Sequence, residues 1–364
     1  MHFTLTMMAL MLLVMMTATE AEAQTTRGES PSGAEGMSGG GGTLIVLNKD
    51  EASVSLLNRE TGKEVGKIAV GDGPHEVAVS PDGKTAVVCN YGTRTPGNSL
   101  SLIDLPTRTV TKTIDLGEYK RPHGILFFAD GQRIVVTSEV AKKLLIVDLA
   151  KGEVIKAIDT EGELSHMVVL SPDGRRAYVA NLGSSSISVI DLESGTFIAR
   201  IATGEGSEGV DVSPDGKEIW VGNRVANNVT IVDATTLKVV YTMDCATFPI
   251  RCKFTPDGRY VLVSCASSGD VVVFDAKKRT LIKRISMELK ALEGTKDRLF
   301  GDRFGDSPVP VGILIPPDGL HAYVANTNAD IITVIDLKTF EIVDRLTAGN
   351  EPDGIGWTAL ELKP

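Results

Sequence analysis

Three of the five histidines in this chain occupy equivalent positions in consecutive stretches of similar sequence. An imidazole nitrogen ligates transition metals, and the ring gains or loses a proton near neutral pH. Two carboxylates occupy the same position further along the chain. A residue needed only for the scaffold would recur in every stretch, so this varied position is the candidate site. In chain order it holds His75, His123, His166, Glu208, Ile250, Val311 and Asp353.

A turn sequence of the Ser-Pro-Asp-Gly type divides the chain into repeats of roughly 42 residues. Asp-Gly between two short apolar runs is a strong signal for a β-hairpin. Each repeat continues with a third strand that ends in Asp and a fourth strand that leads to Gly. Four antiparallel strands per repeat are typical of a β-propeller blade. The turns lie at 80–83, 129–131, 171–174, 213–216, 255–258 and 316–319.

The two ends of the chain supply complementary parts of one further blade. Residues 349–358 match residues 71–80, so the chain ends after a first strand, and residues 43–48, 53–58 and 65–70 provide the other three. Six complete repeats and one shared blade predict an all-β, seven-bladed β-propeller with four antiparallel strands per blade. Pairing of the N- and C-terminal strands closes the ring and removes an open sheet edge. Truncation at either end is therefore expected to open the ring.

The candidate position directly precedes the innermost strand of each predicted blade. Loops from the fourth strand enter there, at the mouth of the central channel, so His75, His123 and His166 are expected to face one another. We predict a ligand-binding mouth formed by these histidines with Glu208 and Asp353. The alternative is a wet channel in which the imidazoles only hydrogen-bond to water and loop carbonyls. No His-x-x-His, Cys-x-x-Cys or acidic calcium loop adds a local metal signature.

Two insertions are predicted on the same side of the ring as this mouth. Residues 91–98 lengthen one blade and bring Arg94 to the rim, and residues 288–307 form a long, charged loop. Loops elaborated on one face of a rigid scaffold are the usual place for binding. Within the second insertion, residues 288–297 are compatible with a short helical lid.

Other polar residues recur at the same place in nearly every repeat, and we assign them to the scaffold. Asp82 represents the hairpin-turn set, Asp104 the set at the next turn, and Asn90 a further set. Short polar side chains at turns hydrogen-bond to nearby backbone groups. Much of the acidic charge is thus expected to stabilise turns.

Two repeats carry Tyr-Val-Ala-Asn, at 178–181 and 323–326, at a fixed spacing from the Asp-Gly turns. In these motifs the chain resembles the YVTN-type β-propeller repeat, a group of mostly exported seven-bladed proteins with YncE-like members. This group is similar in fold to lactonase-like propellers and to the propeller domain of cytochrome d1 nitrite reductase. The resemblance covers about residues 43–364. It implies the architecture and leaves the activity open.

The first 23 residues differ in kind from the rest. Residues 1–23 hold an apolar stretch followed by Ala-Glu-Ala, the layout of a secretory signal peptide. Residues 24–42 are rich in Gly and predict a flexible linker. We therefore expect an exported protein, periplasmic, cell-surface or secreted, with no transmembrane segment once the signal peptide is removed.

The charge balance and the cysteines constrain partners and redox state. With 37 basic and 47 acidic residues the net charge is −10, which argues against a nucleic-acid partner. We expect a monomer whose partner is a small-molecule ligand or another protein. Because exported proteins meet oxidants, a disulfide among the last three cysteines is one interpretation, and buried free thiols are the other. The four are Cys89, Cys245, Cys252 and Cys265.

Three functions are open at this point. The first is an exported binding protein, not an enzyme, that holds a small ligand, a partner, a transition metal or a haem-like group at the mouth. His75, His123 and His166 would be the metal ligands. The second is a lactonase-like or metal-assisted hydrolase in which Glu208 or Asp353 acts as base. The third is a structural or adhesion propeller, and no catalytic residue is assigned.

Overall fold

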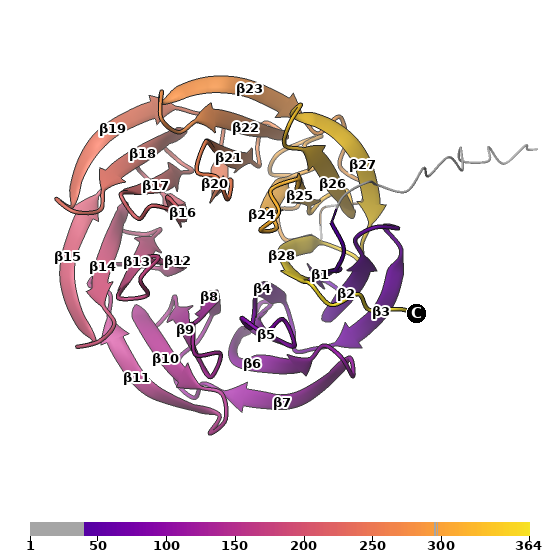
Figure 1. Cartoon of the computed structure of the whole chain (residues 1–364), viewed down its shortest axis with the longest axis horizontal. Coiled ribbons are helices and arrows are strands. Elements are labelled where there is room, and N and C mark those ends of the chain that lie inside the picture. Colours follow the sequence, from indigo (N-terminus) through magenta and orange to yellow (C-terminus); the bar gives the residue numbers. More distant parts are fainter. Residues whose placement is uncertain (1–39, 295, 297) are drawn as a thin grey trace, which may run out of the picture. The chain divides into compact units, whose positions relative to one another are not determined.

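A computed structural model describes residues 40–294, 296 and 298–364 of the protein. The predicted signal peptide 1–23 lies outside these described residues, as does the predicted linker apart from residues 40–42. Strands β1 to β28 form seven four-stranded antiparallel sheets around a central opening (Figure 1). The predicted all-β, seven-bladed propeller is therefore confirmed. We number the sheets as blades 1 to 7 in chain order and give each from its innermost strand outward.

Blade 1 contains β28 (Pro352–Thr358), β1 (Thr43–Asn48), β2 (Ser53–Asn58) and β3 (Glu64–Ala69). Blade 2 contains β4 (Pro74–Val79), β5 (Thr85–Gly92), β6 (Pro96–Asp104) and β7 (Thr109–Asp115). Blade 3 contains β8 (Pro122–Phe127), β9 (Arg133–Ser138), β10 (Lys143–Asp148) and β11 (Glu153–Asp159). Blade 4 contains β12 (Ser165–Leu170), β13 (Arg176–Asn181), β14 (Ser186–Asp191) and β15 (Thr196–Ala202).

Blade 5 contains β16 (Ser207–Val212), β17 (Glu218–Asn223), β18 (Asn228–Asp233) and β19 (Lys238–Asp244). Blade 6 contains β20 (Pro249–Phe254), β21 (Tyr260–Cys265), β22 (Asp270–Asp275) and β23 (Thr280–Ser286). Blade 7 contains β24 (Pro310–Leu314), β25 (His321–Asn326), β26 (Ile331–Asp336) and β27 (Glu341–Thr347). No helix among the described residues has the length and apolar character needed to cross a membrane.

The ring closes where the two ends of the chain pair in blade 1. Strands β1 and β28 are antiparallel, with Thr43 opposite Thr358. The guanidinium of Arg59, which is fully buried, donates to the hydroxyl of Tyr323 at 2.8 Å and pairs with both oxygens of Asp318 in blade 7. Hydrogen bonds within blade 1 and this ion pair between blades 1 and 7 together hold the closed ring.

The hydrophobic core lies between neighbouring blades. Apolar residues from the two middle strands of each sheet are almost completely buried, as expected for sheets that pack face to face. Trp220 of blade 5 shows the packing, since its ring lies 5.7 Å from that of Phe254 and 6.2 Å from that of Phe274 in blade 6. The core is therefore a series of layers around the channel.

The recurring polar residues have the predicted scaffold roles. Asp82 accepts hydrogen bonds from the Ser80 hydroxyl and the Lys84 N–H. Asn90 accepts from the N–H of Gly71, in the loop that enters its blade, at 3.1 Å. These side chains satisfy backbone donors at turns, as their repetition indicated.

The innermost strands approach one another so closely that some positions admit only glycine. A Cβ atom on Gly312 would lie 2.0 Å from the carbonyl oxygen of Asp353, and one on Gly124 would lie 2.6 Å from the Val168 nitrogen. The inner wall of the channel is thus partly bare backbone, and the few side chains that project from it decide its chemistry.

Candidate functional site

The predicted site residues meet at one end of the central channel. His75, His123, His166, Glu208 and Asp353 are each the second residue of an innermost strand. In β4, β8, β12 and β16 the pairing register shifts immediately after the first residue, so the second residue leaves the regular ladder. Such a bulge re-aims a side chain. The imidazole rings of His75 and His123 lie 4.2 Å apart, and those of His123 and His166 lie 3.6 Å apart.

His75 is part of a buried charge network with Asp353 and Lys49. Its Nδ1 atom lies 2.5 Å from Oδ2 of Asp353 and 2.8 Å from Nζ of Lys49, which lies 3.2 Å from the same carboxylate oxygen. Burial lowers the pKa of His75, so the ring is neutral. Burial alone would raise the pKa of Asp353, but His75 and Lys49 outweigh it and hold that pKa well below its usual range.

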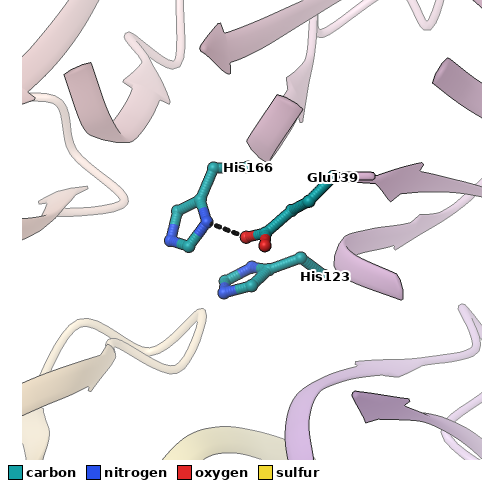
Figure 2. A group of neighbouring side chains, drawn as sticks. All are labelled: His123, Glu139 and His166. Carbon is teal, nitrogen blue, oxygen red and sulfur yellow. Dashed lines mark hydrogen bonds and ion pairs between the residues drawn. The ribbon is translucent and has the colours of Figure 1, made fainter. Parts of the chain in front are cut away.

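His166 is charged in the same cluster, because two carboxylates face it. Its Nδ1 atom hydrogen-bonds to Oε1 of Glu139, and its Nε2 atom lies 3.3 Å from Oε1 of Glu208 (Figure 2). Burial opposes the charged ring, yet Glu139 and Glu208 together raise the pKa of His166 to about 9. Glu139 also accepts a hydrogen bond of 2.6 Å from the Tyr91 hydroxyl.

Glu208 is held as a carboxylate by three cationic neighbours. Nη1 of Arg224 lies 2.8 Å from Oε2 of Glu208, and Nη1 of Arg251 lies 3.6 Å from Oε1. Burial alone would raise the pKa of Glu208, but His166 and these two arginines lower it to about 2. At neutral pH the carboxylate is ionised and fully paired.

His123 has no polar partner. Its side chain is completely buried between His75 and His166, and neither Nδ1 nor Nε2 forms a hydrogen bond among the described residues. Burial and the two neighbouring histidines lower the pKa of His123 well below its ordinary value, so the ring is neutral. A buried donor and acceptor without partners cost stability. The arrangement leaves a nitrogen lone pair free for an electrophile such as a metal ion.

The donor set fits a transition metal. One ligand atom each from His123, Glu139 and His166 lies within 4.8 Å of the others, and Figure 2 shows the carboxylate beside both rings, next to Nδ1 of His166. Imidazole with carboxylate suits Zn²⁺, Fe²⁺ and Cu²⁺. Of the predicted ligands, His123 and His166 are in this group, whereas Nδ1 of His75 is engaged with Asp353. Glu139 joins them, and the sequence analysis missed it.

The missed polar residues occupy two further repeated positions. Lys49, Tyr91, Glu139 and Arg224 each directly follow the scaffold position that holds Asn90 in blade 2. That position varies between repeats as the histidine position does, and this variation was the available signal. Two more residues, Glu76 and Arg251, stand third in their inner strands, where blades 1, 3, 5 and 7 have glycine.

Arg94 does not reach the cluster. It lies exposed in the turn between β5 and β6. The arginine that supports this hairpin is Arg121, whose guanidinium donates to the carbonyl of Thr93 at 2.7 Å and lies 4.5 Å above the Tyr91 ring. The position of Arg94 at the rim therefore gives it no contact with the histidines.

The mouth also has an apolar side, formed by blades 6 and 7 and the second insertion. Ile250 and Val311 stand at the histidine position there and pack with Phe248, Phe300 and Phe304. We call these five residues the apolar wall. Phe248 and Phe304 lie 4.8 Å apart.

The insertion that carries two members of this wall is tied to the ring. Arg298 pairs with both oxygens of Asp330 at 2.6 and 2.8 Å, and the N–H of Leu299 donates to Glu351. The helical lid expected over 288–297 is absent from the described part of that segment. Gly294 has φ +79°, which an α-helix does not allow.

An ion pair separates this cluster from the rest of the channel. Nη2 of Arg251 lies 2.5 Å from Oε1 of Glu76. Beyond the pair, all seven inner strands line a cavity of about 410 Å³ with mostly apolar side chains, including Phe127, Met167 and Trp357. The cluster therefore lies between the mouth and this cavity, whose lining includes Glu76 and Arg251 themselves.

Comparison with known proteins places these residues in a family context. The model of the cytochrome D1 heme domain family matches residues 130–250, a range that includes Glu139, His166 and Glu208 but not His123. Hydrazine synthase subunit beta from Kuenenia stuttgartiensis is 28% identical over 175 residues, 42% of this chain and 45% of that protein. A seven-bladed beta-propeller protein from Mycobacterium tuberculosis is 28% identical over 163 residues, 43% of this chain and 40% of that protein. The matches thus span less than half the length of these relatives.

Solved structures share the fold at low sequence identity. Kuenenia stuttgartiensis hydrazine synthase aligns with a TM-score of 0.66 and 21% identity, over 78% of this chain and 88% of that chain. A functionally unknown protein from Desulfotomaculum acetoxidans gives 0.71 and 15%, over 87% and 99%. Dihydro-heme d1 dehydrogenase NirN in complex with DHE gives 0.62 and 16%, over 86% and 75%. The predicted likeness to the cytochrome d1 propeller is confirmed.

Proposed function

We propose that this cytochrome d1-like seven-bladed propeller is a binding protein that holds a transition metal at the end of its channel. The observation that carries the proposal is His123, whose two ring nitrogens are fully buried and have no partner among the described residues. Folding leaves such a group unsatisfied at a cost, and a bound ion removes that cost. Glu139 would complete the ligand set together with His166, which must release a ring proton when the ion binds.

The surrounding residues would orient the ligands. Tyr91 fixes the Glu139 carboxylate, while Asp353 and Lys49 fix the ring of His75 beside His123. Hydrogen bonds of this kind set the orientation of metal-ligating side chains. A bound metal would supply a Lewis-acid or redox centre in a site that bulk water reaches poorly.

A titration of the full chain with Co²⁺, after dialysis against EDTA, tests this proposal. Absorption bands of ligated Co²⁺ should appear with one equivalent bound. His123→Gln should weaken binding by more than about 100-fold, since loss of a ligand exceeds the effect of loss of a supporting residue. His321→Gln is the matched control, because His321 is also buried but lies outside the cluster. Equal affinity in all three proteins, or no uptake by the unmodified chain, would contradict the proposal.

A haem-like group is the second candidate ligand, and the apolar wall favours it. For a flat, apolar macrocycle with a central metal, His123 would hold the metal, and Phe248 and Phe304 would offer apolar contacts. The family match and the NirN structure support a ligand of this class. Hemin is the probe, and a shifted Soret band that is lost in His123→Gln is the expected result. Uptake of Co²⁺ without hemin would leave the simple ion as the ligand.

The hydrolase alternative is disfavoured by the state of its two carboxylates. The pKa of Glu208 is about 2 and that of Asp353 is lower than usual, and both are engaged in ion pairs. A general base needs a pKa closer to the working pH. Binding without hydrolysis therefore suits the charges better.

Export remains a proposal that rests on residues 1–23 and their similarity to a signal peptide. Expression of the full chain in a bacterium with N-terminal sequencing of the product tests it. A product that begins at Gln24 supports export, and a product that retains residues 1–23 contradicts it.

A further inference from the structure

In some blades a hydrogen bond ties the incoming loop to a residue at or near the end of the second strand, and among the described residues blade 6 has no such bond. In blades 1 and 2 the side-chain oxygens of Asn48 and Asn90 accept the N–H of Gly349 and Gly71 at 3.0 and 3.1 Å. The equivalent residue of blade 6, at the end of β21, is Cys265. A thiol is a poor substitute for an amide oxygen.

A second cysteine stands beside Cys265. Cys245 directly follows β19, in the loop that enters blade 6, and its Sγ atom lies 3.6 Å from Sγ of Cys265. A disulfide bond requires about 2.05 Å, so the sulfurs must approach by about 1.5 Å. Cys265 is completely buried, whereas Cys245 is only partly buried and accessible to a reagent.

We propose that Cys245 and Cys265 form a disulfide that ties the incoming loop of blade 6 to its sheet, as the asparagine hydrogen bonds do in blades 1 and 2. The geometry pairs a loop residue with the sheet residue whose counterpart binds the loop in blades 1 and 2. The other two thiols are committed elsewhere: Cys89 donates to the carbonyl of His123 at 3.1 Å, and Cys252 is buried in the core between blades 5 and 6.

The reaction needs a disulfide oxidant, such as oxidised glutathione. The Cys245 thiol loses its proton, its sulfur attacks the oxidant, and one glutathione leaves as the thiolate. The Cys265 thiol then loses its proton and attacks Sγ of Cys245, which expels the second glutathione. Two cysteine thiols are oxidised and one glutathione disulfide is reduced to two glutathione thiols. Burial raises the pKa of Cys265, which makes Cys245 the first to react.

The disulfide would fix one side of the channel mouth. Phe248 lies three residues after Cys245 in the same loop, contacts Phe304 and lies beneath the guanidinium of Arg224, 5.1 Å from its ring centre. Arg224 in turn pairs with Glu208. A covalent tie at Cys245 therefore restrains both the apolar wall and one edge of the charged cluster. This inference does not depend on a bound metal.

Tryptic mapping of the full chain provides a direct test. Cleavage after Arg251, Lys253 and Arg259 places Cys245, Cys252 and Cys265 on separate peptides. After incubation with oxidised glutathione, alkylation and digestion without reductant, we expect the peptides of Cys245 and Cys265 to be linked. Cys252→Ser should keep the link, and Cys245→Ser should abolish it. Complete alkylation of both cysteines, a link from Cys245 to Cys252, or a persistent glutathione adduct would overturn the proposal.

A stability measurement covers the case in which a serine variant folds poorly. Reduction should lower the Tm of the oxidised protein by several degrees, because a cross-link restricts the unfolded chain. Cys265→Asn installs the residue found in other blades, and its Tm should not respond to the reductant. A Tm that responds equally in the unmodified chain and in Cys265→Asn would contradict the inference.

Discussion

Nη2 of Arg251 lies 2.5 Å from Oε1 of Glu76, although these residues belong to β20 and β4 on opposite sides of the ring opening (Figure 1). The seven sheets make their backbone hydrogen bonds within each blade. The channel is therefore crossed by side chains alone, and this pair joins blade 6 to blade 2. It also forms the boundary between the histidine cluster and the internal cavity.

Removal of one partner of this pair should be strongly destabilising. Arg251→Met leaves the mostly buried carboxylate of Glu76 without its cation, and breaking such a pair typically costs about 3–5 kcal/mol in the free energy of unfolding. Urea denaturation measures the change, and the double variant Glu76→Leu with Arg251→Met should recover much of it. Arg94→Met is the control, and we expect less than about 0.5 kcal/mol there because the side chain is exposed. A cost for Arg251→Met as small as that of the control would show that the pair does not hold the ring.

His123→Leu should stabilise the metal-free protein. The substitution removes two buried nitrogens without partners, each of which costs about 1–3 kcal/mol. His75→Leu has the opposite sign, because it removes a buried hydrogen-bond partner of both Asp353 and Lys49. Thermal unfolding in EDTA compares the two variants. Destabilisation by His123→Leu of the same size as by His75→Leu would mean that His123 has a structural role.

The charge on His166 predicts a stability difference that depends on pH. Its pKa is about 9 in the folded chain and about 6.5 in a model peptide. The stabilisation is complete below pH 6.5 and is lost as the pH rises through 9. The difference in free energy of unfolding between the unmodified chain and His166→Gln should therefore shrink by about 3 kcal/mol across that window. His321→Gln is the control, because burial lowers the pKa of His321 and its difference changes only below pH 6.5.

The ion pair between blades 1 and 7 should matter as much as an internal core contact. Arg59 is fully buried, and Arg59→Leu leaves Asp318 without its cation and the Tyr323 hydroxyl without its donor. We expect a loss of about 3–5 kcal/mol in urea denaturation. Arg133→Leu removes an exposed ion pair with Asp130 and should cost less than about 1 kcal/mol. Similar costs for both would mean that the closure relies on β1 and β28 alone.

The second insertion should distinguish the two candidate ligands. Replacement of residues 289–306 by a short Gly-Ser linker removes Phe300 and Phe304 from the apolar wall. Hemin affinity should fall by about tenfold or more, which corresponds to about 1.4 kcal/mol. Co²⁺ affinity should be unchanged, because His123, Glu139 and His166 lie outside the insertion. Loss of Co²⁺ binding would show that the insertion orders the cluster itself.

The architecture could be predicted from local signals because each blade repeats them. Asp-Gly turns and the polar residues beside them interact within a few residues, so their chemistry can be recognised without the fold. The convergence of His75, His123 and His166 was predictable for a related reason. Residues at one position of a closed repeat meet at one level of the channel, even though they are far apart in the chain.

Other parts of the site depend on contacts between side chains of different blades, and comparison of the repeats does not reveal these contacts. Whether Arg251 points into the channel depends on a register shift after Pro249, and its partner Glu76 comes from another blade. Glu139 looked like a scaffold neighbour until its contact with His166 was known. Arg94 was placed at the site because it lies in an insertion, but its side chain is exposed in the turn between β5 and β6.

Because the inner wall of the channel is partly bare backbone, few side chains determine which ligand the protein prefers. Among the described residues of a blade, three positions project side chains toward the cluster. They are the second and third residues of the inner strand and the residue that follows the scaffold position of Asn90. Glycine is the third residue of the inner strand in four blades. Few of these positions contribute to the hydrophobic clusters: Ile250, Val311 and Ala266 lie in the cluster of the apolar wall, and Met167 packs against the layer between blades 4 and 5. Substitutions at these positions can therefore change the binding preference one blade at a time, while the turns and the hydrophobic core that determine the fold stay the same. The scaffold can stay constant while the channel-lining side chains vary, which makes the ring a practical starting point for engineered receptors.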